Sequence, residues 1–411
     1  MLGILATTLT LHVSGSAEYP VPPHYVAPVA MELPAYLTAT KDPAFGTSFT
    51  RISKPGKLRA GLVCDAKYCS HRYSSAQAWN ADQSLLLISN GCNGLCFFDG
   101  QTYEPLFRRI RSMECEWHPV DPNLMICVGG RTILTWAPRT NREEVVFISD
   151  HYENLQFGPS KGNPSQDGKR IAVRAMRDGV TLVTFAFDLT TRQKFPDIDL
   201  TKVAGTNSAC TISPLGLHIL CFQDAKDGTE QTYIFTVDGT VKQHWTEHHR
   251  PGHGDLTVDA DGSEVYIGIS KSDPDIYQII KRRLSDGAVT SLMSYGEAQH
   301  ASLRAIKRPG WVIVSYGGDP EEVSQHPEWA PFAREVIALR TDGSGKVRRI
   351  VQTRNVPFDY WSETHASPSP DASQIIWSSN WGVPGGPVLE FVARLDWPQE
   401  PEADHLGASA Q

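Results

Sequence analysis

One pattern of apolar and polar residues recurs seven times along the chain. Each copy has a few small or polar residues, a tight turn and then a mainly apolar run, as in AWNADQSLLLI and TVDADGSEVYIGI. Successive turns are 39, 46, 48, 46, 48 and 62 residues apart, at Asp82, Asp121, Asp167, Leu215, Asp261, Pro309 and Asp371. A period of about forty to fifty residues, with a small antiparallel sheet in each unit, is typical of β-propellers. The sequence therefore predicts an all-β fold, a seven-bladed β-propeller that forms a single domain over residues 46–396.

The ends of the repeated region predict how the ring closes. Residues 46–53 (GTSFTRIS) and 387–396 (PVLEFVARLD) both alternate as strands do, and we expect them to complete one blade together. The spacing of 62 residues comes from an insertion at residues 317–335, which predicts a lid or a rim loop over one face. Residues 18–45 predict an extended arm, and the acidic, Ala-rich residues 397–411 predict a disordered tail.

The first residues predict export. An apolar stretch from Leu2 to Val13 precedes the small residues Ser14-Gly15-Ser16-Ala17, so residues 1–17 are interpreted as a signal peptide of a secreted, extracellular protein. A disordered or truncated N-terminus is the alternative. No other segment is long and apolar enough to span a bilayer, so we expect no membrane partner.

Eight cysteines favour an oxidising compartment. Cys115 and Cys127 flank the turn at Asp121, and a second pair flanks the turn at Leu215 in the same way, Cys210 and Cys221. Cross-strand neighbours in a hairpin are close enough to bridge, so each pair predicts a disulfide within one blade. Four cysteines remain that could pair locally, pair with each other or form a zinc site: Cys64, Cys69, Cys92 and Cys96.

The net charge of the chain indicates which classes of molecule it can bind. The chain has 38 basic and 46 acidic residues, a net charge of -8, which argues against nucleic acid as a partner. Ten Trp and thirteen Tyr suit strands, and some of them could form platforms for sugars. We expect the protein to act as a monomer.

Four histidines occupy comparable positions in four repeats, each six to eleven residues before the turn: His71, His253, His300 and His365. In a closed ring these positions converge on the axis. Imidazoles from several blades can bind a divalent metal, one imidazole can act as a general base, or each can simply hydrogen-bond a neighbouring loop. We predict a shared site in which His253, His300 and His365, from consecutive blades, bind a divalent metal ion such as calcium, manganese or zinc. Glu363 or Gln299 could add an oxygen ligand, and His71, across the ring, is the predicted base or substrate contact.

Other polar residues near the predicted mouth could bind an acidic substrate. A guanidinium group binds a carboxylate through two hydrogen bonds, and four arginines are candidates, with ordinary ion pairing as the alternative: Arg72, Arg174, Arg250 and Arg304. We assign Arg72, Asn163 and Arg250 to substrate binding and Arg304 to catalysis. No nucleophile elbow, phosphate-binding loop or dinucleotide-binding motif competes with this site.

With these residues the chain resembles the seven-bladed β-propeller polysaccharide lyases, which include oligogalacturonate lyase, the propeller ulvan lyases and the rhamnosyl-glucuronate lyases. The likeness covers most of residues 46–395 and is carried by HRYSSAQAWNADQSLLLI, NLQFGPSKGNPSQDGK, RPGHGDLTVDADG, QHASLR and ETHASPSPD. It implies β-elimination at a uronic acid of an acidic polysaccharide or oligosaccharide, with the carboxylate neutralised by a metal or arginine. It also implies a catalytic role for His71, metal binding by the segments of the other three histidines, and Tyr73 or Tyr152 as the acid.

The chain departs from these lyases at one place. Several of them have a second catalytic histidine about one hairpin after the first, where this chain has Ser89-Asn90-Gly91-Cys92-Asn93. The protein could use His71 alone, act as a glycoside hydrolase on the same scaffold, or be a non-catalytic propeller that binds a sugar or a partner.

Overall fold

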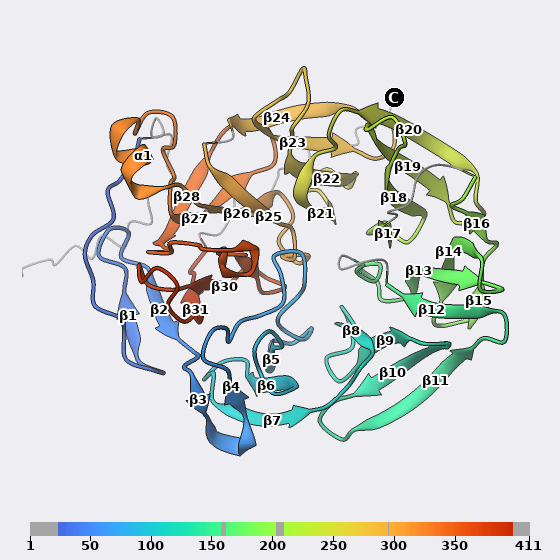
Figure 1. Cartoon of the computed structure of the whole chain (residues 1–411), viewed down its shortest axis with the longest axis horizontal. Helices are drawn as coiled ribbons and strands as arrows, with labels where there is room; N and C mark the ends of the chain where they lie inside the picture. The colour runs from blue at the N-terminus through green and yellow to red at the C-terminus, as the bar shows by residue number, and fades with distance from the viewer. Residues whose placement is uncertain (1–23, 158–161, 203–208, 295, 398–411) are drawn as a thin grey trace, which may run out of the picture.

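The computed structural model describes residues 24–157, 162–202, 209–294 and 296–397, and these form seven small antiparallel sheets around a central axis (Figure 1). The predicted seven-bladed propeller is thus confirmed. Blade one contains β5 (Leu85–Ile88), β6 (Leu95–Asp99) and β7 (Pro105–Arg109). Blade two contains β8 (Glu114–Trp117), β9 (Met125–Gly129), β10 (Thr132–Ala137) and β11 (Arg142–Ile148). Blade three contains β12 (Tyr152–Gln156), β13 (Arg170–Arg177), β14 (Thr181–Asp188), β15 (Gln193–Lys194) and β16 (Ile198–Asp199).

The other four blades follow the same plan, with the innermost strand first. Blade four contains β17 (Ala209–Ile212), β18 (His218–Asp224), β19 (Glu230–Thr236) and β20 (Val241–Glu247), and blade five contains β21 (Gly252–Val258), β22 (Glu264–Ile269), β23 (Gln278–Arg283) and β24 (Val289–Ser294). Blade six contains β25 (Ala298–Ser302), β26 (Trp311–Tyr316), β27 (Glu335–Arg340) and β28 (Val347–Gln352). Blade seven contains β29 (Ser367–Pro368), β30 (Gln374–Ser379) and β31 (Leu389–Arg394), together with β2 (Ser48–Arg51) and β1 (Ala39–Lys41). A small two-stranded sheet precedes blade one, formed by β3 (Gly56–Lys57) and β4 (Val63–Cys64) around the 3-10 turn η1 (Arg59–Gly61).

The hydrophobic core lies between blades, because successive side chains of a strand point to opposite faces of its sheet. In β26, Val312 and Val314 pack toward blade five, whereas Ile313, between them, packs with Trp377 and Phe391 of blade seven. Apolar residues on both faces of the middle strands therefore hold neighbouring blades together.

The last blade combines both ends of the described chain. β2 pairs with β31, with Phe49 opposite Ala393 and Thr50 opposite Val392, and β1 lies on its other side. In Figure 1 the blue strands β1 and β2 lie beside the red β31. This confirms the predicted closure by residues 46–53 and 387–396. The predicted signal peptide and residues 398–411 of the predicted tail lie outside the described residues.

The insertion of blade six lies at the rim. It contains the helix α1 (Pro320–Gln325), whose first turn is capped by Asp319. Val323, Ala330 and Ala333 form a small core with Tyr25, and Figure 1 shows α1 at the outer edge of the ring. Of the two predicted forms, lid or rim loop, the structure shows the rim loop.

All eight cysteines are described and all are in disulfides. Cys115 lies opposite Cys127 and Cys210 opposite Cys221 on paired strands, which confirms the two predicted bridges. The other four pair locally, Cys64 with Cys69 and Cys92 with Cys96, so they do not form the alternative zinc site. Among the described residues, no helix has the length and apolar character needed to cross a membrane.

The disulfides give a first prediction. Replacing Cys210 and Cys221 by Ala should lower the free energy of unfolding by about 2–3 kcal/mol, because the bridge closes a short loop in the unfolded chain. Urea unfolding measures this loss. As a control, the wild-type chain unfolded without reductant should show no reactive thiol, and eight after reduction. Any thiol detected before reduction would contradict the pairing.

Candidate functional site

Irregular pairing at two innermost strands directs two histidines toward the axis. The register of β21 with β22 shifts between Gly252 and Asp255, and that of β25 with β26 shifts between Ala298 and His300. Such bulges re-aim side chains, and His253 within the first has a φ of 52°. Gly254 is required there, since a Cβ would lie 2.2 Å from the carbonyl oxygen of Ile267.

A capped turn in blade seven supplies the next residues. The 3-10 turn η2 (Tyr360–Ser362) begins at Asp359, whose carboxylate accepts a hydrogen bond from the Ser362 amide at 2.9 Å. The other carboxylate oxygen accepts one from Lys67 of blade one at 3.0 Å. After this turn the chain passes through Glu363 to His365, which has a φ of 46°. The turn therefore fixes both side chains against neighbouring blades.

His300, Glu363 and His365 form a compact set of potential metal ligands. One ligand atom from each lies within 4.8 Å of the others, and His300 Nε2 is 2.6 Å from Glu363 Oε2. The His365 ring is buried, and its Nδ1 has no hydrogen-bond partner among the described residues. A buried nitrogen without a partner is costly, and a bound cation would satisfy it. The three residues thus fit a metal ion.

The electrostatics of this set favour a neutral His365. Burial, together with the nearby His300, holds the pKa of His365 well below its usual value. Burial raises the pKa of Glu363. Neutral imidazole is the form that binds metals, and two imidazoles with one carboxylate suit manganese or zinc better than calcium, which prefers oxygen ligands.

His253 lies beside this set. Its ring stacks on His300, with centroids 4.7 Å apart and planes 11° apart. Its Nδ1 donates a hydrogen bond to the Gln299 carbonyl oxygen at 2.7 Å, so in the neutral ring the lone pair is on Nε2. This is the tautomer that a general base needs.

His71 contacts the backbone of this set at His365. Its side chain is 1% exposed, its Nδ1 donates to Glu390 Oε2 at 3.0 Å, and its Nε2 donates to the His365 carbonyl oxygen at 2.7 Å. Burial lowers the pKa of His71, but the charge and hydrogen bond of Glu390 outweigh burial and raise it overall. Both ring nitrogens thus serve a buried link between blade one and blade seven, which holds the backbone of His365.

Two tyrosines border the set. The Tyr73 hydroxyl is 2.6 Å from that of Tyr360, and the Tyr73 ring centroid is 5.1 Å from that of His300. Burial raises the pKa of both hydroxyls, so both stay protonated. Tyr360 is the more exposed, at 39%. Sequence reasoning missed Tyr360, although its position five residues before His365 was a usable signal.

Two cavities are lined in part by residues of this cluster. Cavity A, of about 580 Å³, is bordered by blades three to five and has His253, Asn163, Arg250 and Arg304 among its lining residues. Cavity B, of about 420 Å³, lies between blades one and two, with Arg72 and Tyr73 in its wall and Tyr360 and Trp361 at its edge. His253 lines cavity A and Tyr360 lines cavity B, and their ring centroids are 5.8 Å apart.

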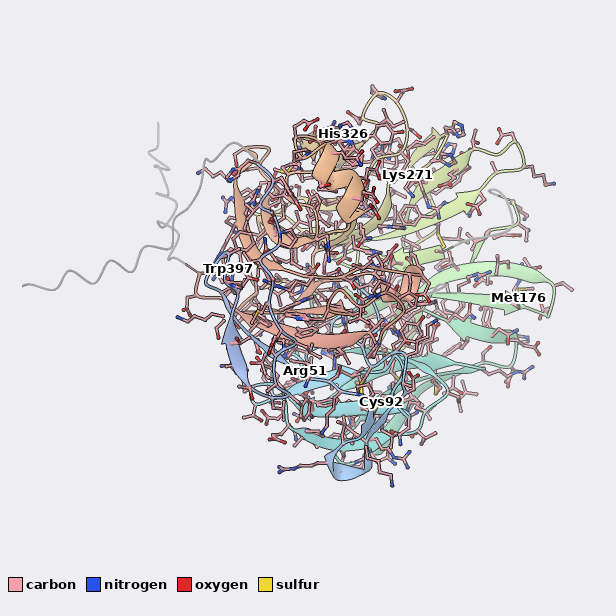
Figure 2. All side chains as sticks on the ribbon, turned by 60° about the vertical axis from the view of Figure 1, so that its left-hand side comes forward. Arg51, Cys92, Met176, Lys271, His326 and Trp397 are labelled. Atoms are coloured by element: carbon pink, nitrogen blue, oxygen red, sulfur yellow. A yellow bond between two sulfur atoms is a disulfide. The ribbon has the colours of Figure 1, made fainter. Side chains whose placement is uncertain are left out.

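Two of the predicted arginines in cavity A have acidic partners. Arg304 makes two hydrogen bonds of 2.7 Å with the Asp255 carboxylate, and Arg250 lies 2.7 Å from Glu230. The described residues place no carboxylate within 4 Å of two other cations that line this cavity, Arg174 on β13 and Lys271 (labelled in Figure 2). Cavity A therefore presents positive charge that no carboxylate of the described residues neutralises within 4 Å.

The remaining predicted residues have other contacts. Arg72 forms an ion pair with the buried Glu116 of blade two. Asn163 donates a hydrogen bond to the Ser75 carbonyl oxygen at 3.0 Å. Tyr152 donates to Asp197 at 2.9 Å and lines neither cavity, so the structure does not bring it together with the histidines.

Comparison with known proteins gives a likeness in fold. No family model matches the chain, and no curated protein matches it in sequence. A structure of oligogalacturonate lyase in complex with manganese superposes with a TM-score of 0.59 at 16% identity, covering 87% of this chain and 96% of that chain. The fold is that of oligogalacturonate lyase. The enzyme from Vibrio parahaemolyticus gives a TM-score of 0.58 at 10% identity, with the same coverage. The resemblance to seven-bladed propeller lyases that the sequence suggested is thus found again in the fold.

The buried link through His71 gives a second prediction. His71→Ala should lower the free energy of unfolding by about 3–5 kcal/mol, because it leaves the Glu390 carboxylate buried without its partner. Urea unfolding of wild type and variant measures the difference. His326→Ala is the control, since His326 (labelled in Figure 2) lies after α1 with its side chain 63% exposed, and it should change stability by no more than about 0.5 kcal/mol. Equal stability of the two variants would contradict the link.

Proposed function

We propose that this chain is a polysaccharide lyase that cleaves an acidic polysaccharide or oligosaccharide at a uronic acid by β-elimination. One observation carries the proposal: the ligand set of His300, Glu363 and His365 adjoins His253 at the edge of a cavity that also contains Arg174 and Lys271. β-Elimination at a uronate requires groups that neutralise its carboxylate, a base that removes a proton and a cavity that binds the sugar. The fold shared with oligogalacturonate lyase supports the same choice.

The substrate carboxylate would lie in cavity A. Arg174 lies half-buried there, and burial lowers its pKa, so an anion would stabilise its charged form. Lys271 adds a second positive charge at the same cavity. Neutralising the carboxylate lowers the cost of the enolate that develops when the neighbouring carbon loses its proton.

His253 is the proposed base. Nε2 of His253 removes the proton from C5, the electron pair forms the C4–C5 double bond, and the bond between C4 and the glycosidic oxygen breaks. The leaving oxygen takes a proton from Tyr360, whose hydroxyl stays protonated because burial raises its pKa. Tyr73, behind it, hydrogen-bonds to Tyr360, and His71 positions His365 through its backbone.

The proposed metal is manganese or zinc, held by His300, Glu363 and His365. When bound, it would supply a positive charge that polarises the uronate carboxylate. A related structure with this fold is in complex with manganese, which makes that ion the first to test. Glu363 replaces His253 in the ligand set that the sequence suggested.

A glycoside hydrolase on this scaffold receives less support. Hydrolases of that kind use a pair of carboxyl groups at the cleaved bond. Three acidic residues near the mouth already hold basic partners: Asp255 holds Arg304, Glu116 holds Arg72 and Glu153 holds Arg131.

The proposed setting is extracellular. Four disulfides in one chain are typical of proteins that work in an oxidising compartment.

Metal content tests the ligand set. After dialysis against manganese and then buffer, wild type and His253→Ala should retain about one ion per chain by elemental analysis, whereas His365→Ala should retain almost none. Thermal unfolding of each variant shows that it is folded. Loss of the ion in His253→Ala to the same extent would instead favour the three-histidine site of His253, His300 and His365.

Activity tests the reaction. Manganese-loaded wild type, given uronate-containing oligosaccharides, should release products that absorb in the ultraviolet because they contain the new double bond. His253→Ala should lower kcat at least about a hundredfold while keeping its metal. New reducing ends without the absorbance would identify a hydrolase, and full turnover by His253→Ala would remove its role as the base.

A further inference from the structure

The turn η2, which carries Tyr360, is largely exposed and is held from two sides. Phe358, just before the turn, is 37% exposed. On the inner side, the Tyr73 hydroxyl contacts that of Tyr360, and His365 Nε2 donates a hydrogen bond to the Tyr360 carbonyl oxygen at 2.8 Å. The outer side begins at the capping residue Asp359, and its contacts come from a different part of the chain.

A loop before blade one, residues 65–68, holds this outer side. Lys67 Nζ donates a hydrogen bond to Asp359 Oδ2 at 3.0 Å, and the Tyr68 hydroxyl donates one to the same oxygen. The Phe358 ring centroid lies 5.0 Å from Lys67 Nζ and 6.5 Å from the Tyr68 ring centroid. Burial raises the pKa of Asp359, but its hydrogen bonds outweigh burial and lower the pKa overall, so the carboxylate stays charged.

The loop is fixed by covalent and backbone contacts of its own. A disulfide between its two flanking residues closes it, and the Asp65 carboxylate accepts hydrogen bonds from the amides of Lys67 and Tyr68 at 2.7 and 2.6 Å. Gly91 is required beside the loop, because a Cβ there would lie 2.1 Å from the Tyr68 carbonyl oxygen. The segment of residues 89–93, which contains no histidine, thus supports the loop that contacts η2.

We propose that Lys67 and Tyr68 are positioning residues for the acid of the proposed reaction. By holding the Asp359 carboxylate they keep η2, and with it the Tyr360 hydroxyl, where the leaving oxygen can be protonated. The inference rests on the proposed function and adds the residues that orient its acid. Neither Lys67 nor Tyr68 lines cavity A or cavity B, so their effect passes through the turn and not through contact with the substrate.

The leaving group of the substrate tests this role. Manganese-loaded Lys67→Met and Tyr68→Phe should each lower kcat about tenfold on a uronate whose C4 carries a sugar, because the sugar oxygen needs a proton as it leaves. KM should change by less than about twofold, since neither residue lines a cavity. On a uronate whose C4 carries nitrophenol, kcat should be unchanged, because that oxygen leaves as a stable anion. Lys67→Arg should restore most of the lost kcat, because it keeps the positive charge.

Lys169→Met is the matched control. The Lys169 side chain is 61% exposed, against 54% for Lys67, and it pairs with Asp167 at 3.6 Å in the turn before β13. It lines neither cavity, so its loss should leave kcat unchanged with both leaving groups. An equal loss with both leaving groups in Lys67→Met and Tyr68→Phe, or no loss with either, would overturn the inference.

The order of η2 is measured without catalysis. In the zinc-loaded chain labelled with fluorotryptophan, the fluorine resonance of Trp361 is identified by its loss in Trp361→Phe. We expect Lys67→Met and Tyr68→Phe to shift or broaden this resonance and Lys169→Met to leave it in place. An unchanged resonance in the first two variants would overturn the inference. Wild type that eliminates neither leaving group would reject the lyase proposal, whereas a shifted resonance would still support the hold of the loop on η2.

Discussion

Closure of the ring by β2 and β31 is the constraint on which the rest of the molecule depends. Without this pairing, residues from blade one and blade seven would have no fixed distance, and the histidines could not meet. A buried polar chain continues from the closing strands toward the axis. The Glu390 amide on β31 donates to the hydroxyl of Ser53 at 2.8 Å, and the Glu390 carboxylate holds His71, which holds the His365 carbonyl oxygen. The closure and the ligand set are therefore parts of one hydrogen-bonded system.

The charged groups around the axis are of two kinds, those with partners of opposite charge and those without. Buried groups with satisfied partners, such as Arg304 with Asp255, join neighbouring blades and are removed from solvent. Groups without acidic partners, such as Arg174, face the cavity in which a ligand can supply the counter-charge. Because an unpaired buried charge is costly, this contrast is informative about function. It distinguishes cavity A from cavity B more clearly than their volumes do.

Much of this could be predicted from the sequence. The repeat has a strong period and its turns are short, so the blade count, the closing strands and the two hairpin disulfides followed from local patterns. The distance of each residue from the turn of its repeat also identified His253 and His300 as candidates. Their detailed roles could not be predicted, because they depend on bulges that rotate single side chains and on partners far away in the chain. His71 contacts Glu390, 319 residues later, and Arg304 contacts Asp255 of the preceding blade. No periodic pattern identifies such pairs.

The disulfides divide the ring into two halves of different construction. All four lie before β19, in the region of blades one, two and four, and each joins residues at most 12 positions apart. Blades five to seven, which supply His253, His300 and His365, contain no disulfide and are held by packing, hydrogen bonds and ion pairs. Cys115 is itself in the wall of cavity B. Cys210 is in the wall of cavity A. A change in the redox state of the surroundings would therefore act on one wall of each cavity, and would leave the covalent structure around the three histidines unaltered.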